Sequence, residues 1–251
     1  MITARALTGL PEVRPGDDLA ALLAAARGAG GFPPGEVLVV AHKVVSKAEG
    51  RIVALGDVEP SPRAVELARK LGKEDPRRVE VVLRESAEVV RAQRGVLISR
   101  THHGFVCANA GVDASNAAGA DELILLPADP DASARALRAG LGRAGAGSPA
   151  VVIADSFGRA WRHGQCDVAV GIAGLAPLED WRGRTDAHGR ELHATWIAIA
   201  DQAAAAADLA RGGKDAGEPA VVLTGLERHV TGEDGPGAAA LVRARDEDLF
   251  G

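Results

Sequence analysis

The sequence has few of the residues that build metal and disulfide frameworks. It contains only two cysteines, Cys107 and Cys166, and neither belongs to a Cys-x-x-Cys or a Cys/His spacing. Structural zinc sites need four such ligands at short spacings, so this pattern argues against zinc. We interpret both thiols as small buried side chains rather than as nucleophiles.

Long apolar runs and long basic runs are also missing. No stretch reaches membrane-spanning length, and the N-terminal segment MITARALTGLPEV lacks the apolar core of a secretion signal. The formal net charge is −5, without the clustered Lys and Arg that neutralise a phosphate backbone. We therefore expect a soluble cytoplasmic protein that binds neither a membrane nor nucleic acid.

The common nucleotide-binding motifs are absent as well. The sequence has no G-x-x-x-x-G-K-[ST] phosphate loop, and no G-x-G-x-x-G follows a predicted strand. The motifs G-x-S-x-G and H-E-x-x-H are missing too. Any nucleotide chemistry in this chain must therefore use a less common site.

Strand and helix patterns are interspersed along the 251 residues. Apolar runs predict strands at 37–41, 77–83, 122–127, 149–158, the beginning of 194–213, and 218–226. Helical spacing and capping residues predict helices within 59–73, 129–143 and the rest of 194–213. Since few clean β-α-β repeats occur, we predict an α+β (mixed α/β) architecture. It would form a single domain over 1–251, with two intimate lobes, mixed sheets and a lobe break near 142–150.

Two short polar segments each allow two interpretations. HKVVSKAEGR spaces Lys43, Lys47 and Arg51 four apart, so a helix would place them on one face. That face is either a solvated basic surface or the surroundings of a bound anion. GVDASN offers Asp113 and Asn116, which suit either an Asx-turn or a hard divalent cation.

Two arginine-containing segments are equally open. ADSFGRAWRHGQCD brings Asp155 and Ser156 to the end of a predicted strand, before a turn at Gly158. The basic residues after them suit either a surface ion-pair loop or a metal–phosphate site, and they are Arg159, Arg162 and His163. DWRGRTDAHGRELHATW suits either an exposed hairpin or an anion contact through Arg182, Arg184 and Arg190.

Taken together, the chain resembles the coenzyme F420-0:L-glutamate ligases. The similar blocks occur in the same order over nearly the whole chain, and they are LPEVRPGDDL, AHKVVSKAEGR, GFVCANAGVDASN, ADSFGRAWRHGQCDVAVGIAG, RGRTDAHGREL and ADQAAAAADL. The resemblance implies a GTP-dependent enzyme that joins L-glutamate to coenzyme F420-0 by an amide bond, through an acyl phosphate. It also implies further γ-linked glutamate addition, two Mg²⁺ or Mn²⁺ ions per site, K⁺, and a homodimer.

The resemblance also implies roles for individual residues. The metal ligands would be Asp113, Asp155 and Ser156, and the catalytic groups would be Asp113, Asp155 and Lys47. The GTP contacts would be Leu10, Pro11, Glu12, Val13, His42, Lys47, Asn116, Gly213 and Lys214. Some relatives have a small polar residue in place of His42.

Two positions depart from the family pattern. Gly213 and Lys214 stand where some members place a glutamine that binds the second metal, and Gln202 replaces the glutamate of an Ala-Asp-Glu block. Either the second metal site is lost, or the Lys214 ammonium replaces part of its charge. Two other functions stay open: a nucleotide- or deazaflavin-binding module without turnover, and a related amide ligase that acts on another small carboxylate.

Overall fold

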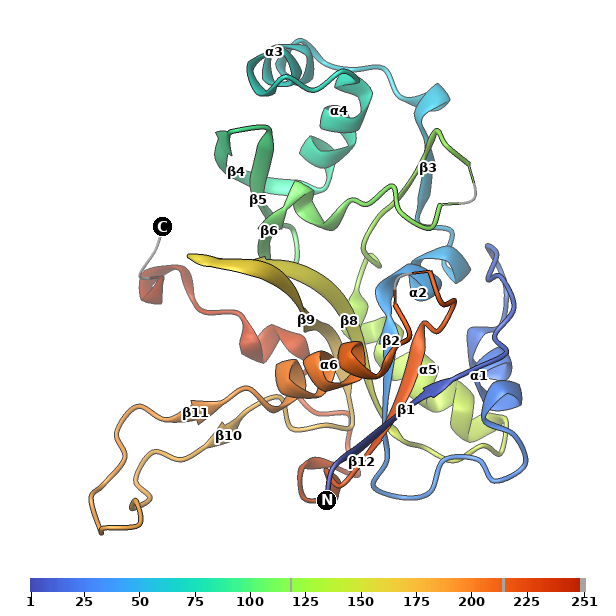
Figure 1. The fold of residues 1–251 in the computed structure, drawn as a ribbon, viewed down its shortest axis with the longest axis vertical. Coiled ribbons are helices and arrows are strands. Elements are labelled where there is room, and N and C mark those ends of the chain that lie inside the picture. Colours follow the sequence, from blue (N-terminus) through green and yellow to red (C-terminus); the bar gives the residue numbers. More distant parts are fainter. Residues whose placement is uncertain (118, 214, 249–251) are drawn as a thin grey trace.

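A mixed β-sheet forms the centre of the protein (Figure 1). The computed structural model describes residues 1–117, 119–213 and 215–248. The sheet order is β1-β12-β2-β8-β9. The strand bounds are Thr3–Leu7 for β1, Ala220–Thr224 for β12, Val37–Ala41 for β2, Ala150–Arg159 for β8 and Arg162–Ala173 for β9. β2 and β8 run parallel, whereas the other neighbouring pairs are antiparallel.

Helices cover both faces of this sheet. α1 (Leu19–Arg27) and α5 (Pro130–Arg143) pack on one face, and α6 (Ile199–Ala210) packs on the other. Successive side chains of β2 alternate between these two buried clusters, because side chains of a strand point to opposite faces. This burial on both faces explains why the strand is a continuous apolar run rather than an alternating one.

A second group of elements lies above the sheet in Figure 1. It contains α3 (Pro62–Leu71) and α4 (Pro76–Arg84), which enclose a separate buried cluster with Leu97. Its strands are β4 (Ser86–Gln93), β5 (Val96–Thr101) and β6 (Val106–Ala108), while β3 (Ile52–Ala54) pairs with β7 (Glu122–Ile124). The chain enters this group directly after α2 (His42–Ala48), so α2 joins it to the sheet.

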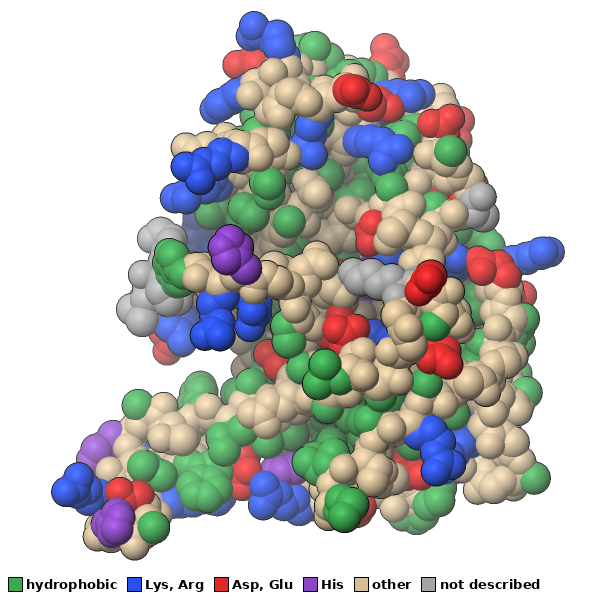
Figure 2. Space-filling view, in the orientation of Figure 1, with side chains coloured by type: hydrophobic (Ala, Val, Ile, Leu, Met, Phe, Trp, Pro, Cys, Tyr) green, Lys and Arg blue, Asp and Glu red, His purple; other side chains and the backbone are tan. Residues whose placement is uncertain are grey.

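A long arm leaves the body between β9 and α6. Its base is the short pair β10 (Glu179–Asp180) and β11 (Trp196–Ile197), and basic and histidine side chains cover its far end (Figure 2). No helix in the described ranges has the length and apolar character needed to cross a membrane. Cys107 and Cys166 are both free thiols, and Cys107 is buried.

The α+β prediction is confirmed, and most predicted elements form. The strand predicted at 77–83 is wrong, because these residues form helix α4. Asp75 caps this helix by accepting a hydrogen bond from the Arg77 amide, Pro76 occupies its first turn, and Val79 and Val82 share its buried face. The predicted turn at Gly158 is also wrong: β8 continues to Arg159. Residues 142–150 connect α5 to β8, and a lobe break there stays a prediction.

Candidate functional site

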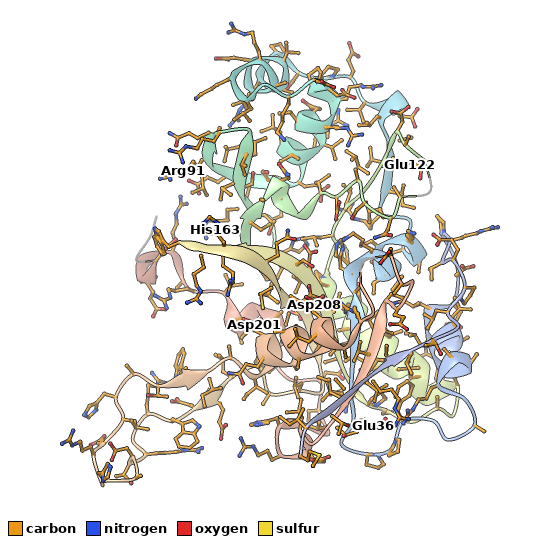
Figure 3. All side chains as sticks on the ribbon, viewed as in Figure 1. Glu36, Arg91, Glu122, His163, Asp201 and Asp208 are labelled. Carbon is orange, nitrogen blue, oxygen red and sulfur yellow. The ribbon has the colours of Figure 1, made fainter. Side chains whose placement is uncertain are left out.

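A cavity of about 460 Å³ opens where β2 ends and its pairing with β8 stops. Because the two strands are parallel neighbours, their carboxyl ends lie at the same edge of the sheet. His42 follows β2 directly, and Asp155 follows Ala154, the last residue of β8 that pairs with β2. The N-terminal segment 10–13, α2, Asn116 and the end of α6 complete the wall, with Asp208 on the C-terminal part of α6 (Figure 3).

Asp155 contributes a buried carboxylate to this cavity. Its Oδ1 accepts a hydrogen bond from the Ser156 amide at 2.8 Å and lies 3.3 Å from His42 Nε2. Burial alone would raise the pKa of Asp155, but His42, Lys43 and the Ser156 amide outweigh burial, so the pKa is lowered. The group is therefore a fixed negative charge at neutral pH.

The lysines of α2 are paired with carboxylates from other parts of the chain. Lys43 Nζ lies 2.9 Å from Asp113 Oδ2, and Lys47 Nζ lies 2.5 Å from Glu12 Oε1. Arg51 follows the end of α2 and pairs with Glu85 outside the cavity. Of the two interpretations of this segment, the structure disfavours a solvated basic face for the lysines, because both line the cavity and the Lys47 side chain is only 8% exposed.

Asp113 forms the Asx-turn that its sequence context allows. Its carboxylate accepts hydrogen bonds from the Ser115 amide and the Ser115 hydroxyl, both at 2.8 Å. Burial would raise its pKa, but the bonds from Lys43 and Ser115 lower the pKa to about 2. Asp113 does not line the large cavity itself, but its partners Lys43 and Ser115 do. Asn116, in the left-handed conformation at φ 59°, lines the cavity directly.

A chain of polar contacts on the opposite wall was not predicted from the sequence. Ser156 Oγ donates to Asp167 Oδ1 at 2.6 Å, and Arg211 Nη1 donates to Asp167 Oδ2 at 2.6 Å. The Nε and Nη2 atoms of Arg211 are buried and have no hydrogen-bond partner among the described residues. Such donors favour a bound anion. The only signal in the sequence is the position of Arg211 just before Gly212 and Gly213, at the end of a predicted helix.

The structure brings most of the predicted site residues together. The predicted positions that line the large cavity are Leu10, Pro11, Glu12, Val13, His42, Lys47, Asn116, Asp155, Ser156 and Gly213. Lys214 lies outside the described residues. These positions come from five separate parts of the chain, so their convergence is a property of the fold and not of any one motif.

Other candidates lie elsewhere. Arg159, Arg162 and His163 are exposed at the tip of the β8–β9 hairpin and do not line the cavity (Figure 3). On the arm, Arg182 pairs with Asp180 and stacks on Trp196, with its guanidinium carbon 4.1 Å from the ring centroid. For the basic residues at the hairpin tip and for Arg182 on the arm, the structure favours the surface interpretation over an anion site.

The charges of the large cavity suit a divalent cation that is held together with an anion. Its lining contains five carboxylates and three cationic side chains other than histidine, namely Glu12, Asp155, Asp167, Asp208 and Glu218 against Lys43, Lys47 and Arg211. No group of three or more His, Cys, Asp or Glu is arranged as a metal cage in the part of the chain described. Mg²⁺ does not need such a cage, because it commonly takes one or two carboxylates and completes its shell with water and phosphate oxygens. Ionised Asp155 fits this donor chemistry.

Comparisons with known proteins agree with one another. A model of the family F420-0:Gamma-glutamyl ligase matches residues 9–225. Three relatives are named coenzyme F420:L-glutamate ligase. The protein from Methanothermobacter thermautotrophicus is 44% identical over 245 residues, which cover 96% of each chain. That from Methanopyrus kandleri is 46% identical over 240 residues (95% of this chain, 93% of the relative), and that from Halobacterium salinarum is 44% identical over 249 residues (97% and 93%). The chain therefore belongs to the F420-0:gamma-glutamyl ligase family.

Proposed function

We propose that this protein is a GTP- and divalent-metal-dependent ligase that joins L-glutamate to coenzyme F420-0 through an amide bond. The names of its full-length relatives support glutamate ligation in coenzyme F420 biosynthesis. The observation that carries the nucleotide part is the large cavity, where ionised Asp155, buried Lys47 and the unpartnered Arg211 donors meet. A triphosphate with its cation needs both signs of charge in one place.

The proposed reaction has two steps. A carboxylate oxygen of coenzyme F420-0 attacks the γ-phosphorus of GTP, the bond to the β-phosphate oxygen breaks, and GDP leaves. The amine nitrogen of glutamate then attacks the carbon of the acyl phosphate, and the carbon–oxygen bond to phosphate breaks. Overall, two carboxylate-bearing substrates and GTP give the amide, GDP, inorganic phosphate and one proton. A second cycle on the γ-carboxylate of the product would extend it by another glutamate.

In this reaction the cationic side chains would bind phosphate, and the carboxylates would bind the metal ion. Lys47, Lys43 and the free donors of Arg211 would bind phosphate oxygens and stabilise negative charge as it moves from the nucleophile to GDP. Asp155 and Asp113 would hold one Mg²⁺ or Mn²⁺, with Lys43 moving from Asp113 to phosphate as the ion binds. Ser156 would serve a second ion, since its hydroxyl donates to Asp167 and keeps its oxygen lone pairs free. The bound ions supply Lewis-acid polarisation of the phosphate oxygens.

We also propose that two chains associate through the arm. The arm leaves the body as a separate projection (Figures 1 and 2) and carries Trp196, whose exposure is 52%. Tryptophan is enriched at protein–protein interfaces, and a second chain packed on the arm would cover Trp196. Size-exclusion chromatography with light scattering would measure a dimer mass for the intact chain. A monomer mass at micromolar concentration would contradict this part of the proposal.

Mass spectrometry tests the enzyme directly. Coenzyme F420-0 is incubated with the protein, GTP, Mn²⁺ and L-glutamate, and GDP is quantified in the same tube. A mass gain of one or more glutamyl units, matched by GDP, supports the ligase and counts the additions. GDP without a mass gain would indicate another carboxylate acceptor, and neither product would favour a binding module without turnover.

A further inference from the structure

A second cavity lies on the other side of Asp113 from the large cavity. Its volume is about 200 Å³, and it lies among α4, β5, β7 and the loop before Asp113. The residues that line it are Lys73, Arg78, Val79, Val82, Leu97, Asn109, Val112, Asp113, Ala114 and Leu123. Since Asp113 also binds Lys43, which lines the large cavity, this ion pair forms a wall that the two cavities share.

Two cations of this second cavity form no ion pair with a carboxylate among the described residues. Lys73 follows α3, is half-buried, and has no ion pair with any described residue. Arg78 lies in the first turn of α4, and its guanidinium makes only a long contact, 3.4 Å to the carbonyl oxygen of Ala120. The nearby carboxylate of Asp75 is already bonded to Arg77. Unpaired cations on the wall of a cavity favour an anionic ligand.

The same cavity also offers an acceptor that the fold leaves unused. Asn109 Oδ1 is buried and accepts no hydrogen bond from any described residue. Its loop is held in an unusual conformation, because Asn109, Ala110 and Gly111 have φ values of 53°, 53° and 72°. Two consecutive left-handed residues with a side chain are costly, and buried Ala110 anchors them in the cluster around Leu97. The amide is therefore fixed at the cavity wall.

We propose that this second cavity binds the amino-acid substrate L-glutamate. Lys73 and Arg78 would bind its two carboxylates, and Asn109 Oδ1 would accept a hydrogen bond from its ammonium group. Asn109 lies in the loop before Asp113, so the ammonium would lie beside the wall shared with the large cavity, where the acyl phosphate forms. This assignment rests on the proposed ligase function and adds to it the place and polarity of the second substrate.

Steady-state kinetics of three variants and one control test the assignment. Lys73→Gln and Arg78→Gln should each raise KM for L-glutamate about 10- to 100-fold, because each removes a charge-assisted hydrogen bond. KM for GTP should stay unchanged. Lys70→Gln is the matched control, because Lys70 is exposed on α3 and does not line the cavity. An active enzyme in which neither Lys73→Gln nor Arg78→Gln changes KM for glutamate would overturn the inference and leave the proposed function intact.

Glutarate separates the carboxylate contacts from the ammonium contact. It has both carboxylates of glutamate but no amine, so it should inhibit competitively against glutamate. Asn109→Gly keeps the left-handed backbone available and removes the side-chain amide, including the Oδ1 acceptor. This variant should raise KM for glutamate and leave the inhibition constant of glutarate unchanged. An equal rise in KM for glutamate and in the inhibition constant of glutarate would overturn the role of Asn109.

Saturation-transfer NMR keeps the inference testable without turnover. L-glutamate is titrated into the wild-type protein and into Lys73→Gln in the presence of GDP. Loss of the glutamate signal in the variant supports the site even if the wild-type chain proves inactive as a ligase. An equal signal in both proteins, or none in the wild type, would overturn it.

Discussion

His42 Nε2 lies 3.3 Å from Asp155 Oδ1, and this contact links the two residues that follow the last paired position of the parallel strands β2 and β8. The two residues are far apart in the sequence, and the parallel pairing of β2 with β8 brings them together. His42 is almost fully buried, and no hydrogen bond to its Nε2 forms within the described residues. The pair thus holds the Asp155 carboxylate at the cavity, and the Nε2 atom of His42 can still form a hydrogen bond.

Removing the charge of Asp155 should abolish nucleotide turnover without unfolding the protein. Asp155→Asn keeps the shape of the side chain, but it removes the negative charge that we expect to bind the metal ion. We expect GDP release to fall at least 100-fold, in the range measured for single electrostatic groups in active sites. Circular dichroism and thermal melting check the fold. Exposed Asp57→Asn is the control, and full activity in Asp155→Asn would remove this residue from the mechanism.

Lys47→Met should act mainly on GTP binding. The Lys47 side chain is 8% exposed and its partner Glu12 is 64% exposed, so the variant leaves Glu12 in water and should cost little stability. We expect KM for GTP to rise about 10- to 100-fold because one charge-assisted contact to phosphate is lost. Initial rates over a range of GTP concentrations measure this. An unchanged GTP dependence would mean that Lys47 serves only its ion pair with Glu12.

Two glycines of the β8–β9 hairpin should respond differently to alanine. A Cβ atom at Gly171 would lie 2.2 Å from the Pro130 carbonyl oxygen at the start of α5, whereas one at Gly158 would meet nothing within 4 Å. We expect Gly171→Ala to lower the free energy of unfolding by about 1–3 kcal/mol or more, since backbone must move. Gly158→Ala should change it by less than about 0.5 kcal/mol. Urea denaturation compares the two, and similar values would contradict the packing of α5 on β9.

Asp201 should make stability depend on pH in an unusual direction. Burial raises the pKa of this carboxyl above its ordinary value of 3.8, although its Oδ1 accepts a hydrogen bond from the Ala169 amide at 2.9 Å. The folded state therefore holds the proton more tightly than the unfolded state, and this contribution to stability is lost as pH rises through the folded pKa. Asp201→Asn keeps an oxygen acceptor without the charge. We expect its stability relative to wild type to increase between about pH 4 and pH 7, and a constant difference would contradict the raised pKa.

Much of the fold could be predicted from local pattern. The apolar run of β2, the Ser61 cap of α3 and the Asp129 cap of α5 each carry a signal within a few residues. Helix α4 was misassigned because RRVEVVL is rich in β-branched residues, which favour strands when taken alone. Its Asp-Pro start and its packing against α3 decide otherwise.

The candidate site was less predictable, because it depends on contacts between distant residues. Asp155 and Lys47 lie beside apolar runs and could be singled out. The roles of Arg211 and Asp167 depend on how α6 packs on β9, and no local pattern reports that. Likewise, the second cavity depends on the strained loop at Asn109 and on a helix that the sequence did not predict.

The parallel pairing of β2 with β8 also has a meaning for the order of folding. The chain between these strands contains α2 through α5, including the whole group around α3 and α4, and it must close into a loop before the strands can pair. Such long-range closure is slow compared with helix formation. Lys43 and Lys47 would therefore emerge from the ribosome long before the large cavity forms. The proposed nucleotide binding would require that β8 has been synthesised and has paired with β2. The nucleotide affinity that we propose should thus appear abruptly, as one of the last properties that the folding chain acquires.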